Sequence, residues 1–323
     1  MPAIRRILVA VKDPSARSLP AVAKALQLAR AFAAEVELFH AIDSSIYADA
    51  IGMSEGRLLE IEGDERTQFL QRLERVAARA RRHGATVSAA AEWDFPVYEA
   101  IIREALRRRA DLIVAERHAG RHIAAGLLGL SDWELLRLSP VPVLLVKRPR
   151  PYHRPVVLAA VDPTHAFAKP ARLDAQILAL ARRFSEALRG KLHVVHAYDP
   201  LRASVLAETG AAAVSVQQAA AAAAAAALER AVRSAAIPAA RRHLRGRHPI
   251  DAVLEVAAEL RSDLAVLGAV SRSGLKRLFI GNTAEQLLDR LPCDLLVVKP
   301  TGFKSRVPRP RRGARLITLQ PPY

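Results

Sequence analysis

The amino-acid sequence predicts an α/β protein made of two tandem, doubly wound domains, each with a five-stranded parallel sheet. One observation behind this prediction is that the second half of the chain repeats the first. The matching segments are 9–14 with 158–163, 111–114 with 263–266, and 143–147 with 295–299. The other is that short apolar runs alternate with amphipathic stretches, as strands and helices do in α/β folds. A repeat of about 150 residues is too long for a solenoid unit, so each copy is predicted to be a complete domain.

We therefore expect a first domain over residues 1–150, a second over 151–300 and a tail over 301–323. In the first domain the apolar, β-branched run from Ile4 to Val11 predicts a strand, and Gly84 is expected to end a long amphipathic helix. The other strands are predicted at 36–41, 86–91, 112–115 and 143–147, and the helices at 19–32, 62–83, 97–108 and 131–138.

The second copy repeats this order of elements. Its strands are predicted at 155–160, 192–197, 239–244, 264–267 and 295–299, and its helices at 174–188, 217–236, 250–260 and 284–291. Strands such as 112–115 and 143–147 are apolar without alternation, which is typical of parallel strands covered by helices on both faces. Ligand sites of such sheets lie at the carboxyl ends of the strands.

The composition is that of a globular protein, with 51% hydrophobic and 25% charged residues among 323, which is enough for two cores. The alanine run 219–227 lies in a predicted helix and is interpreted as helix-favouring rather than membrane-spanning. The chain enters a strand at Ile4 without an export signal, so we expect a cytoplasmic protein without membrane contact. The single cysteine, Cys293, excludes an intramolecular disulfide and is predicted to be a buried thiol.

The loop after the fourth strand distinguishes the two copies. In the second copy it runs from Gly268 through Gly274 to Gly281-Asn282-Thr283, just before a predicted helix. Glycines let the backbone approach a ligand, and free amides with a hydroxyl at a helix start suit an anion. The first copy has Glu116 in place of Gly268. The pattern therefore predicts a phosphate site in the second domain and not in the first.

These features resemble the universal stress protein (UspA) family in its tandem form. The resemblance rests on the acid after the first strand, the glycine loop and the closing run Cys293–Pro300, and it covers residues 4–300. The run Ser131-Asp132-Trp133 of the first copy is similar to the UspE branch. The resemblance implies Rossmann-like domains of the adenine nucleotide alpha hydrolase type. It also implies an intramolecular pseudo-dimer in which strands 143–146 and 295–298 pair, while further oligomerisation stays open.

The ATP-binding members of the family carry Gly-x2-Gly-x9-Gly-Ser/Thr, and two of the four corresponding positions depart from it here. Ser271 adds a side chain where the motif has glycine, and Asn282 stands where it has a hydroxyl, although Thr283 is adjacent. Asp162 matches the acid that faces the nucleoside. The candidate cofactor-binding residues are Asp162, Gly268, Ser271, Gly274, Gly281, Asn282 and Thr283. ATP is the cofactor that the resemblance implies in the second domain; the alternative is that the glycines only shape a loop.

Catalytic and metal-binding residues are not predicted. The strand ends of the second copy offer Asp162, His196 and Ser271 without a second acid to form a catalytic pair. His40 and His196 lie at equivalent strand ends, where we expect them to hydrogen-bond the backbone rather than to take part in chemistry.

The formal net charge is +17, and the tail contributes strongly to it. The segment from Phe303 to Tyr323 holds six basic residues, no acidic one and four prolines. This composition predicts a disordered basic arm that contacts nucleic acid weakly and with steep salt dependence. The alternative is that the basicity is merely compositional, because arginine is frequent throughout the chain.

The resemblance implies a non-enzymatic role in stress tolerance, including resistance to DNA damage, through binding and signalling. The partners expected are an adenine nucleotide or another small ligand. Two other functions stay open: an ATP-binding protein with slow nucleotide turnover, and a basic nucleic-acid-associated protein.

Overall fold

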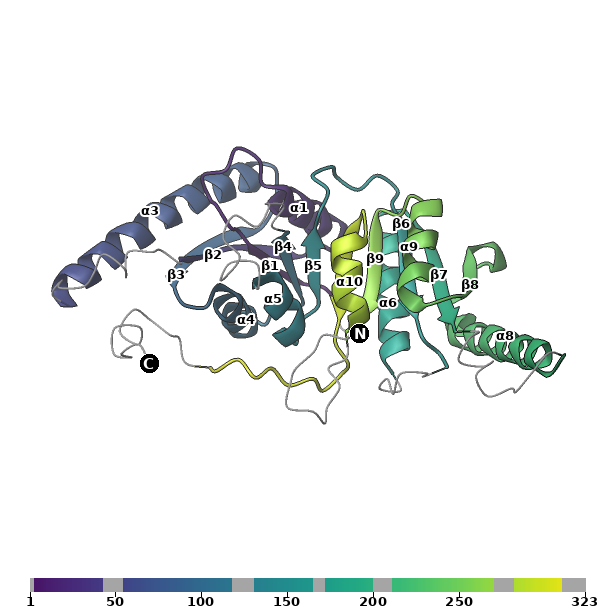
Figure 1. Ribbon diagram of the computed structural model, residues 1–323. Helices are drawn as coiled ribbons and strands as arrows, with labels where there is room; N and C mark the ends of the chain where they lie inside the picture. The colour runs from purple at the N-terminus through teal and green to yellow at the C-terminus, as the bar shows by residue number, and fades with distance from the viewer. Residues whose placement is uncertain are drawn as a thin grey trace, which may run out of the picture. The chain divides into compact units, whose positions relative to one another are not determined.

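The computed structural model describes residues 3–42, 55–117, 131–164, 172–199, 211–269 and 282–309 (Figure 1). Its contacts divide the chain into two compact units. One unit comprises the first domain together with the segment that begins at Lys304, and the other comprises the second domain from Tyr152 to Phe303. Each unit is an α/β domain around one parallel sheet, which confirms the predicted fold class. The pairing of the two final strands stays a prediction.

The sheet of the first domain has the strand order β3-β2-β1-β4-β5, and each neighbouring pair is parallel. Its strands are β1 (Arg6–Ala10), β2 (Glu35–Ile42), β3 (Val87–Trp93), β4 (Leu112–Glu116) and β5 (Val143–Val146). Its helices are α1 (Pro20–Phe32), α3 (Glu55–Arg82), α4 (Val97–Arg107) and α5 (Ser131–Leu138).

The second domain has the order β10-β9-β6-β7-β8, and its neighbouring strands are parallel as well. Its strands are β6 (Val156–Val161), β7 (Lys191–Tyr198), β8 (Arg242–Gly246), β9 (Leu264–Gly268) and β10 (Asp294–Val298). Its helices are α6 (Leu173–Ala187), α8 (Ala211–Val232), η1 (Arg233–Ala235), η2 (Ala239–Arg241), α9 (Pro249–Glu259) and α10 (Asn282–Arg290).

The strand order explains the three layers of each domain. From β6 the chain passes through α6, β7 and α8 to the edge strand β8. It then returns through α9 to the other side of β6, where β9, α10 and β10 follow. Right-handed crossovers in opposite directions place the two helix pairs on opposite faces of the sheet. Consistently, α6 packs against α8 and α9 packs against α10, while in the first domain α4 packs against α5. The central strands are therefore buried on both faces.

The internal repeat extends to backbone capping. Asp111 Oδ2 accepts hydrogen bonds from the backbone amides of Arg5 and Arg6 at 2.8 and 3.0 Å, and Asp263 Oδ2 accepts one from Val156 at 2.9 Å. Each carboxylate thus satisfies backbone amide donors at the start of the first strand of its own domain. The repeated aspartates 111 and 263 consequently serve the fold.

Two features at the sheet edges depend on local chemistry. Gly84, with φ at +80°, follows the end of α3 as predicted, since a left-handed residue terminates the helix at little cost for glycine. Helix α3 begins at Glu55, seven residues before the predicted start.

The outer strand β8 carries Arg242, His243 and Arg245, and charged residues such as the two arginines keep an edge strand from pairing with other chains.

The described part of the tail contacts the first domain. Arg103 Nη1 donates a hydrogen bond to the carbonyl oxygen of Pro308 at 3.2 Å. Residues 310–323 lie outside the described part of the chain, so the predicted basic arm stays a prediction. Among the described helices, none combines the length and the apolar character that crossing a membrane requires.

Candidate functional site

The predicted ligand site lies where the order of strands in the second domain reverses. Strands β6 and β9 are neighbours there, with Val157 beside Leu264 and Ala159 beside Val266. Asp162 comes directly after β6, and Gly268 is the last residue of β9. Crevices outside the carboxyl ends of parallel strands at such a switch point are the usual ligand sites of this fold. The structure therefore brings two of the seven predicted residues to one edge of the sheet.

Asp162 is partly exposed and held in a defined turn. Its Oδ1 accepts a hydrogen bond from Thr164 Oγ1 at 2.9 Å. Its backbone amide donates to Asp174 Oδ1 at 3.1 Å, and Asp174 is a buried residue in the first turn of α6. The prediction concerned acids at strand ends; Asp174 is a second acid that approaches Asp162 from the following helix instead. Through the bond from the backbone amide of Asp162, Asp174 holds this turn in place.

Gly268 is required by the packing of α6. A Cβ atom at this position would lie 2.7 Å from Leu173 Cδ2 and 2.9 Å from Ile177 Cδ1, closer than van der Waals contact permits. Both side chains are fully buried. The missing side chain at Gly268 is therefore explained by close approach of a helix to a strand end, and contact of Gly268 with a phosphate stays a prediction.

The rest of the predicted loop is described only in part. Ser271, Gly274 and Gly281 lie outside the described residues. Asn282 and Thr283 form the first turn of α10, where backbone amides lack an acceptor within the helix, but their side chains are not described. A helix start of this kind attracts anions through its amides and its dipole.

The equivalent edge of the first domain has a different character. Strands β1 and β4 are neighbours, and Glu116 ends β4 at the position that Gly268 has in β9. Asp13 follows β1, and its Oδ1 accepts a hydrogen bond from the backbone amide of Ser15 at 2.8 Å. The two domains thus keep the acid after their first strand and differ at the end of their fourth.

The two strand-end histidines hydrogen-bond the backbone, as predicted. His40 Nδ1 donates to the carbonyl of Val11 at 2.8 Å, and His196 Nδ1 donates to that of Val161 at 3.3 Å. Burial lowers the pKa of His40 below its ordinary value, and the bond to Val11 and the charge of Asp13 offset this only in part. A neutral His40 with its proton on Nδ1 is the consequence.

A histidine pair was missed by the sequence analysis. His193 Nδ1 lies 3.1 Å from His243 Nε2, across the neighbouring strands β7 and β8, and the two rings are nearly parallel. Burial, then the charges of His243, Arg241 and Lys191, lower the pKa of His193 to about 4. One neutral ring donates and the other accepts, so the pair is a hydrogen bond within the sheet. Its signal in the sequence is weak, because only β7 gives its histidine an apolar context, while β8 is rich in arginine.

Other predicted features concern metals and the cysteine. Cys293 is fully buried at the start of β10, which confirms the predicted buried thiol. Within the described ranges, three or more histidine, cysteine, aspartate or glutamate side chains nowhere gather as metal ligands would.

Comparison with known proteins assigns both domains to one family. The model of the Universal stress protein family matches residues 3–147 and again residues 157–299. The curated relatives include Universal stress protein E of Salmonella typhi and of Escherichia coli (strain K12). Each is 28% identical over 309 residues, which cover 93% of this chain and 96% of the relative.

Solved structures agree with this assignment. A protein of unknown function from Pseudomonas aeruginosa PAO1 is 26% identical with a TM-score of 0.70, and the match covers 92% of this chain and 93% of that one. A universal stress protein from Archaeoglobus fulgidus DSM 4304, at 18% identity and a TM-score of 0.60, covers 91% of this chain and 98% of its own and supports the fold.

Proposed function

The chain belongs to the universal stress protein family, and from that premise we propose that it is a non-enzymatic stress-tolerance protein whose second domain binds a small ligand at the switch point of its sheet. The proposed role includes resistance to DNA damage and acts through binding and signalling. An adenine nucleotide is the ligand that we propose. The cytoplasm is the proposed location.

The observation that carries the ligand proposal is the contrast between the two switch points. In the second domain, Asp162 presents a partly exposed carboxylate beside a strand that ends in glycine. In the first domain the corresponding strand ends in Glu116, which adds a negative charge to an edge that already holds Asp13. Two carboxylates at one edge oppose a phosphate, so the second domain is favoured as the site.

The described residues offer one acceptor for the nucleoside and backbone amides for the phosphate of a nucleotide. The Asp162 carboxylate has acceptor capacity beyond its bond from Thr164, and it suits the donors of a nucleoside. The amides in the first turn of α10, at Asn282 and Thr283, suit a phosphate. Gly268 would contribute indirectly, by letting α6 pack closely against the strand end.

We propose the absence of catalysis because the polar groups near the switch point form hydrogen bonds within the local structure. Asp162 accepts from Thr164, Asp174 holds a backbone amide and His196 donates to a carbonyl. A hydrolase needs a base that holds a nucleophile or water, whereas the hydrogen bonds described for these groups join them to Thr164 and to the backbone. Slow turnover of a bound nucleotide is the alternative, and it is tested by the same preparation.

Calorimetric titration of the full chain with ATP and Mg²⁺ tests the ligand proposal. Saturable binding tighter than millimolar supports a nucleotide site, and release of ADP over hours would support the slow-turnover alternative. No saturable heat at millimolar ATP would contradict the nucleotide and leave stress tolerance to a different ligand.

A matched pair of variants tests which domain binds. Asp162→Ala should weaken ATP binding about ten-fold or more, because a charge-assisted hydrogen bond to the nucleoside is lost. Asp13→Ala removes the corresponding acid of the first domain and should leave the affinity unchanged. Equal losses from both variants would show that the assignment to the second domain is wrong.

A further inference from the structure

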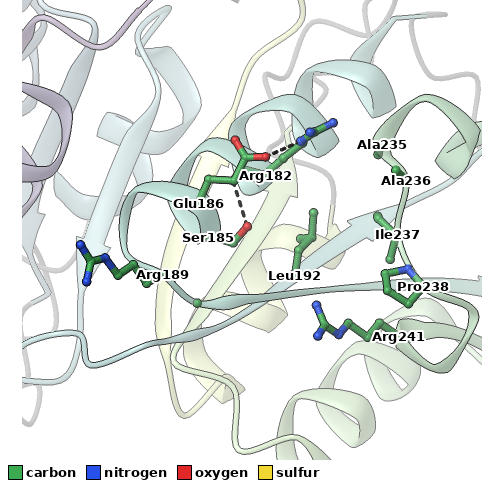
Figure 2. A pocket seen from close by; sticks show the side chains of 11 residues that line it. Arg182, Ser185, Glu186, Arg189, Leu192, Ala235, Ala236, Ile237, Pro238 and Arg241 are labelled. Carbon is green, nitrogen blue, oxygen red and sulfur yellow. Dashed lines mark hydrogen bonds and ion pairs between the residues drawn. The ribbon is translucent and has the colours of Figure 1, made fainter.

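A hollow in the second domain lies at the edge of the sheet opposite to Asp162. It has a volume of about 360 Å³ and lies where β7 begins, between the carboxyl-terminal turn of α6 and the turn that joins η1 to η2. Figure 2 shows its lining. Its volume falls in the range of sites for small organic molecules.

Three arginines line this hollow, and two of them have no carboxylate partner among the described residues. Arg182 forms an ion pair with Glu186 at 2.6 Å. Neither Arg189 nor Arg241 lies within ion-pair distance of a carboxylate in the described part of the chain. In Figure 2 the guanidinium of Arg241 extends toward Leu192, while that of Arg189 extends away from the other lining side chains. Arg241 therefore supplies an uncompensated positive charge to the hollow, and Arg189 lies at its margin.

The wall next to these arginines is apolar. Leu192 and Ile237 are almost fully buried at its base, and Ala236 and Pro238 are its exposed apolar members. A guanidinium beside an apolar wall recognises a ligand with an anionic end and a hydrocarbon body, because each part meets a matching surface.

The first domain shows that the fold does not require these arginines. Arg189 and Ala33 occupy the same position in the two domains. Each has φ at +53°, follows the first helix of its domain, and lies two residues before the second strand begins. The residues that follow, Gly190 and Ala34, each donate a backbone bond into the preceding helix, to Ser185 and Ala29. Alanine thus serves the fold at the site where the second domain has arginine.

Arg241 has an uncharged counterpart as well. Strand β8 starts at Arg242, which is paired with Val194, and the corresponding residue of β2, Leu38, is paired with Ala89. The residue before Ala89 is Ser88, so the first domain has serine where the second has Arg241. The first domain thus lacks arginine at the two positions that Arg189 and Arg241 occupy in the second.

We propose that this hollow is a binding site for a small phosphate monoester, with Arg241 and Arg189 on the phosphate and the wall of Leu192, Ile237 and Pro238 on its organic group. The guanidinium fork matches phosphate oxygens in pairs, and a doubly charged phosphate is attracted more strongly than a singly charged carboxylate. Arg189 is exposed, and we expect a rotamer change to bring its guanidinium toward the same phosphate. The site is separate from the proposed nucleotide edge.

The histidine pair provides a reporter of binding. The charge of Arg241 contributes to the low pKa of His193. A phosphate bound to Arg241 neutralises part of that charge, so the pKa of His193 rises on binding. The His193 ring resonances then titrate at higher pH in the complex than in the free protein.

Calorimetry and NMR titration of the full chain with phenyl phosphate test the proposal, with inorganic phosphate and benzyl alcohol as comparison probes. Phenyl phosphate should bind with a dissociation constant below a millimolar, inorganic phosphate more weakly, and benzyl alcohol without saturation. Arg241→Gln should weaken binding of phenyl phosphate about ten-fold or more. Arg189→Gln should weaken it several-fold and leave the pKa of His193 unchanged in the free protein.

Arg230→Gln is the matched control, because it removes one positive charge from α8 of the same domain outside the hollow. It should change the affinity less than two-fold at 150 mM salt. Equal losses from Arg230→Gln and Arg241→Gln would reduce the effect to net charge and overturn the proposal. Loss of phenyl phosphate binding on Asp162→Ala, with Arg241→Gln unaffected, would place the ligand at the nucleotide edge and also overturn it. Absence of saturable binding of phenyl phosphate to the unmodified chain would also overturn the proposal.

Discussion

At the scale of single residues, Arg103 organises a buried ion-pair cluster in the first domain. Its Nε and Nη2 donate to both oxygens of Asp94 at 2.8 and 2.7 Å, and its Nη1 donates to Glu99 at 2.8 Å. The three side chains are less than a tenth exposed. Loss of one partner in such a cluster leaves charges buried without compensation, which costs more than the loss of an exposed pair.

We expect Arg103→Met to lower the free energy of unfolding by about 3 kcal/mol, because Asp94 and Glu99 lose their guanidinium partner. Urea unfolding measures it. Arg57→Met is the control, since Arg57 and Glu60 form a pair that is about two-thirds exposed, and it should change stability by less than about 0.5 kcal/mol. Similar losses in the two variants would show that the cluster is no stronger than a surface pair.

Glu37 should make the first domain more stable in acid. Burial, then the nearby charge of Glu104, raise the pKa of Glu37 from 4.5 to about 7, and Arg108 at 2.6 Å offsets this in part. The folded protein therefore holds a proton that the unfolded chain loses. This stabilisation is complete below pH 4.5 and is lost as the pH rises through 7.

The test compares Glu37→Gln with the unmodified chain in urea unfolding at pH 5 and pH 8. The variant cannot ionise, so its stability relative to the unmodified chain should rise from pH 5 to pH 8 by on the order of 1 to 2 kcal/mol. Glu35→Gln, on the same strand but exposed, should show no such rise. A difference that stays constant with pH would contradict the raised pKa.

His193 should act with the opposite sign in the second domain. Its pKa of about 4 means that the folded protein disfavours a proton that the unfolded chain binds near pH 6.5. The stabilisation is present above pH 6.5 and is lost as the pH falls toward 4. His193→Gln should therefore flatten the acid side of the stability profile by on the order of 1 kcal/mol, after allowance for partial exposure. His248→Gln, at an exposed position, serves as the control, and an identical profile in both variants would refute the assignment.

At the scale of secondary-structure elements, Gly268 determines how closely α6 approaches β9. We expect Gly268→Ala to destabilise the protein by about 1 to 3 kcal/mol, because its Cβ would overlap the buried side chains of Leu173 and Ile177. Gly63→Ala is a control of opposite sign, since Gly63 lies inside α3 with no atom within 4 Å of an added Cβ. It should stabilise by about 0.5 to 1 kcal/mol. Thermal unfolding of both variants measures the two changes, and a stabilising effect of Gly268→Ala would contradict the packing role of Gly268.

Most elements were predictable from local sequence, although β8 begins three residues after the predicted start at 239, because 239–241 form η2 instead. The predicted helix 131–138 coincides with α5, and the predicted start of α1 differs by one residue, because apolar periodicity and terminating residues are local signals. The seven missing residues of α3 include Gly56, which lowers helix propensity without preventing the helix. The contacts of Asp174, His243 and Arg103 were not predictable, because each depends on which segments the fold brings together. The ligand site was predicted as far as Asp162 and Gly268, although the packing role of Gly268 appears only in three dimensions.

At the scale of the whole molecule, the tail can contribute to the stability of the fold and to the binding of nucleic acid. Its described part reaches the first domain through Pro308, whose carbonyl accepts from Arg103. The residues beyond 309 carry Arg311, Arg312 and Arg315, and the part from 304 to 309 carries Lys304, Arg306 and Arg309. Truncation at two positions separates these contributions.

A chain that ends at Arg309 should keep its thermal stability, whereas one that ends at Phe303 should lose about 1 kcal/mol, because Arg103 then loses the Pro308 carbonyl. If the tail binds duplex DNA, each lost positive charge removes the release of about one counterion. The slope of log affinity against log salt should then flatten by up to about three in the longer truncated chain and by up to about five in the shorter. Mobility shifts across a salt series measure it. Equal slopes for all three chains would make the basicity compositional, and a large stability loss on removal of 310–323 alone would mean that this segment packs on a domain.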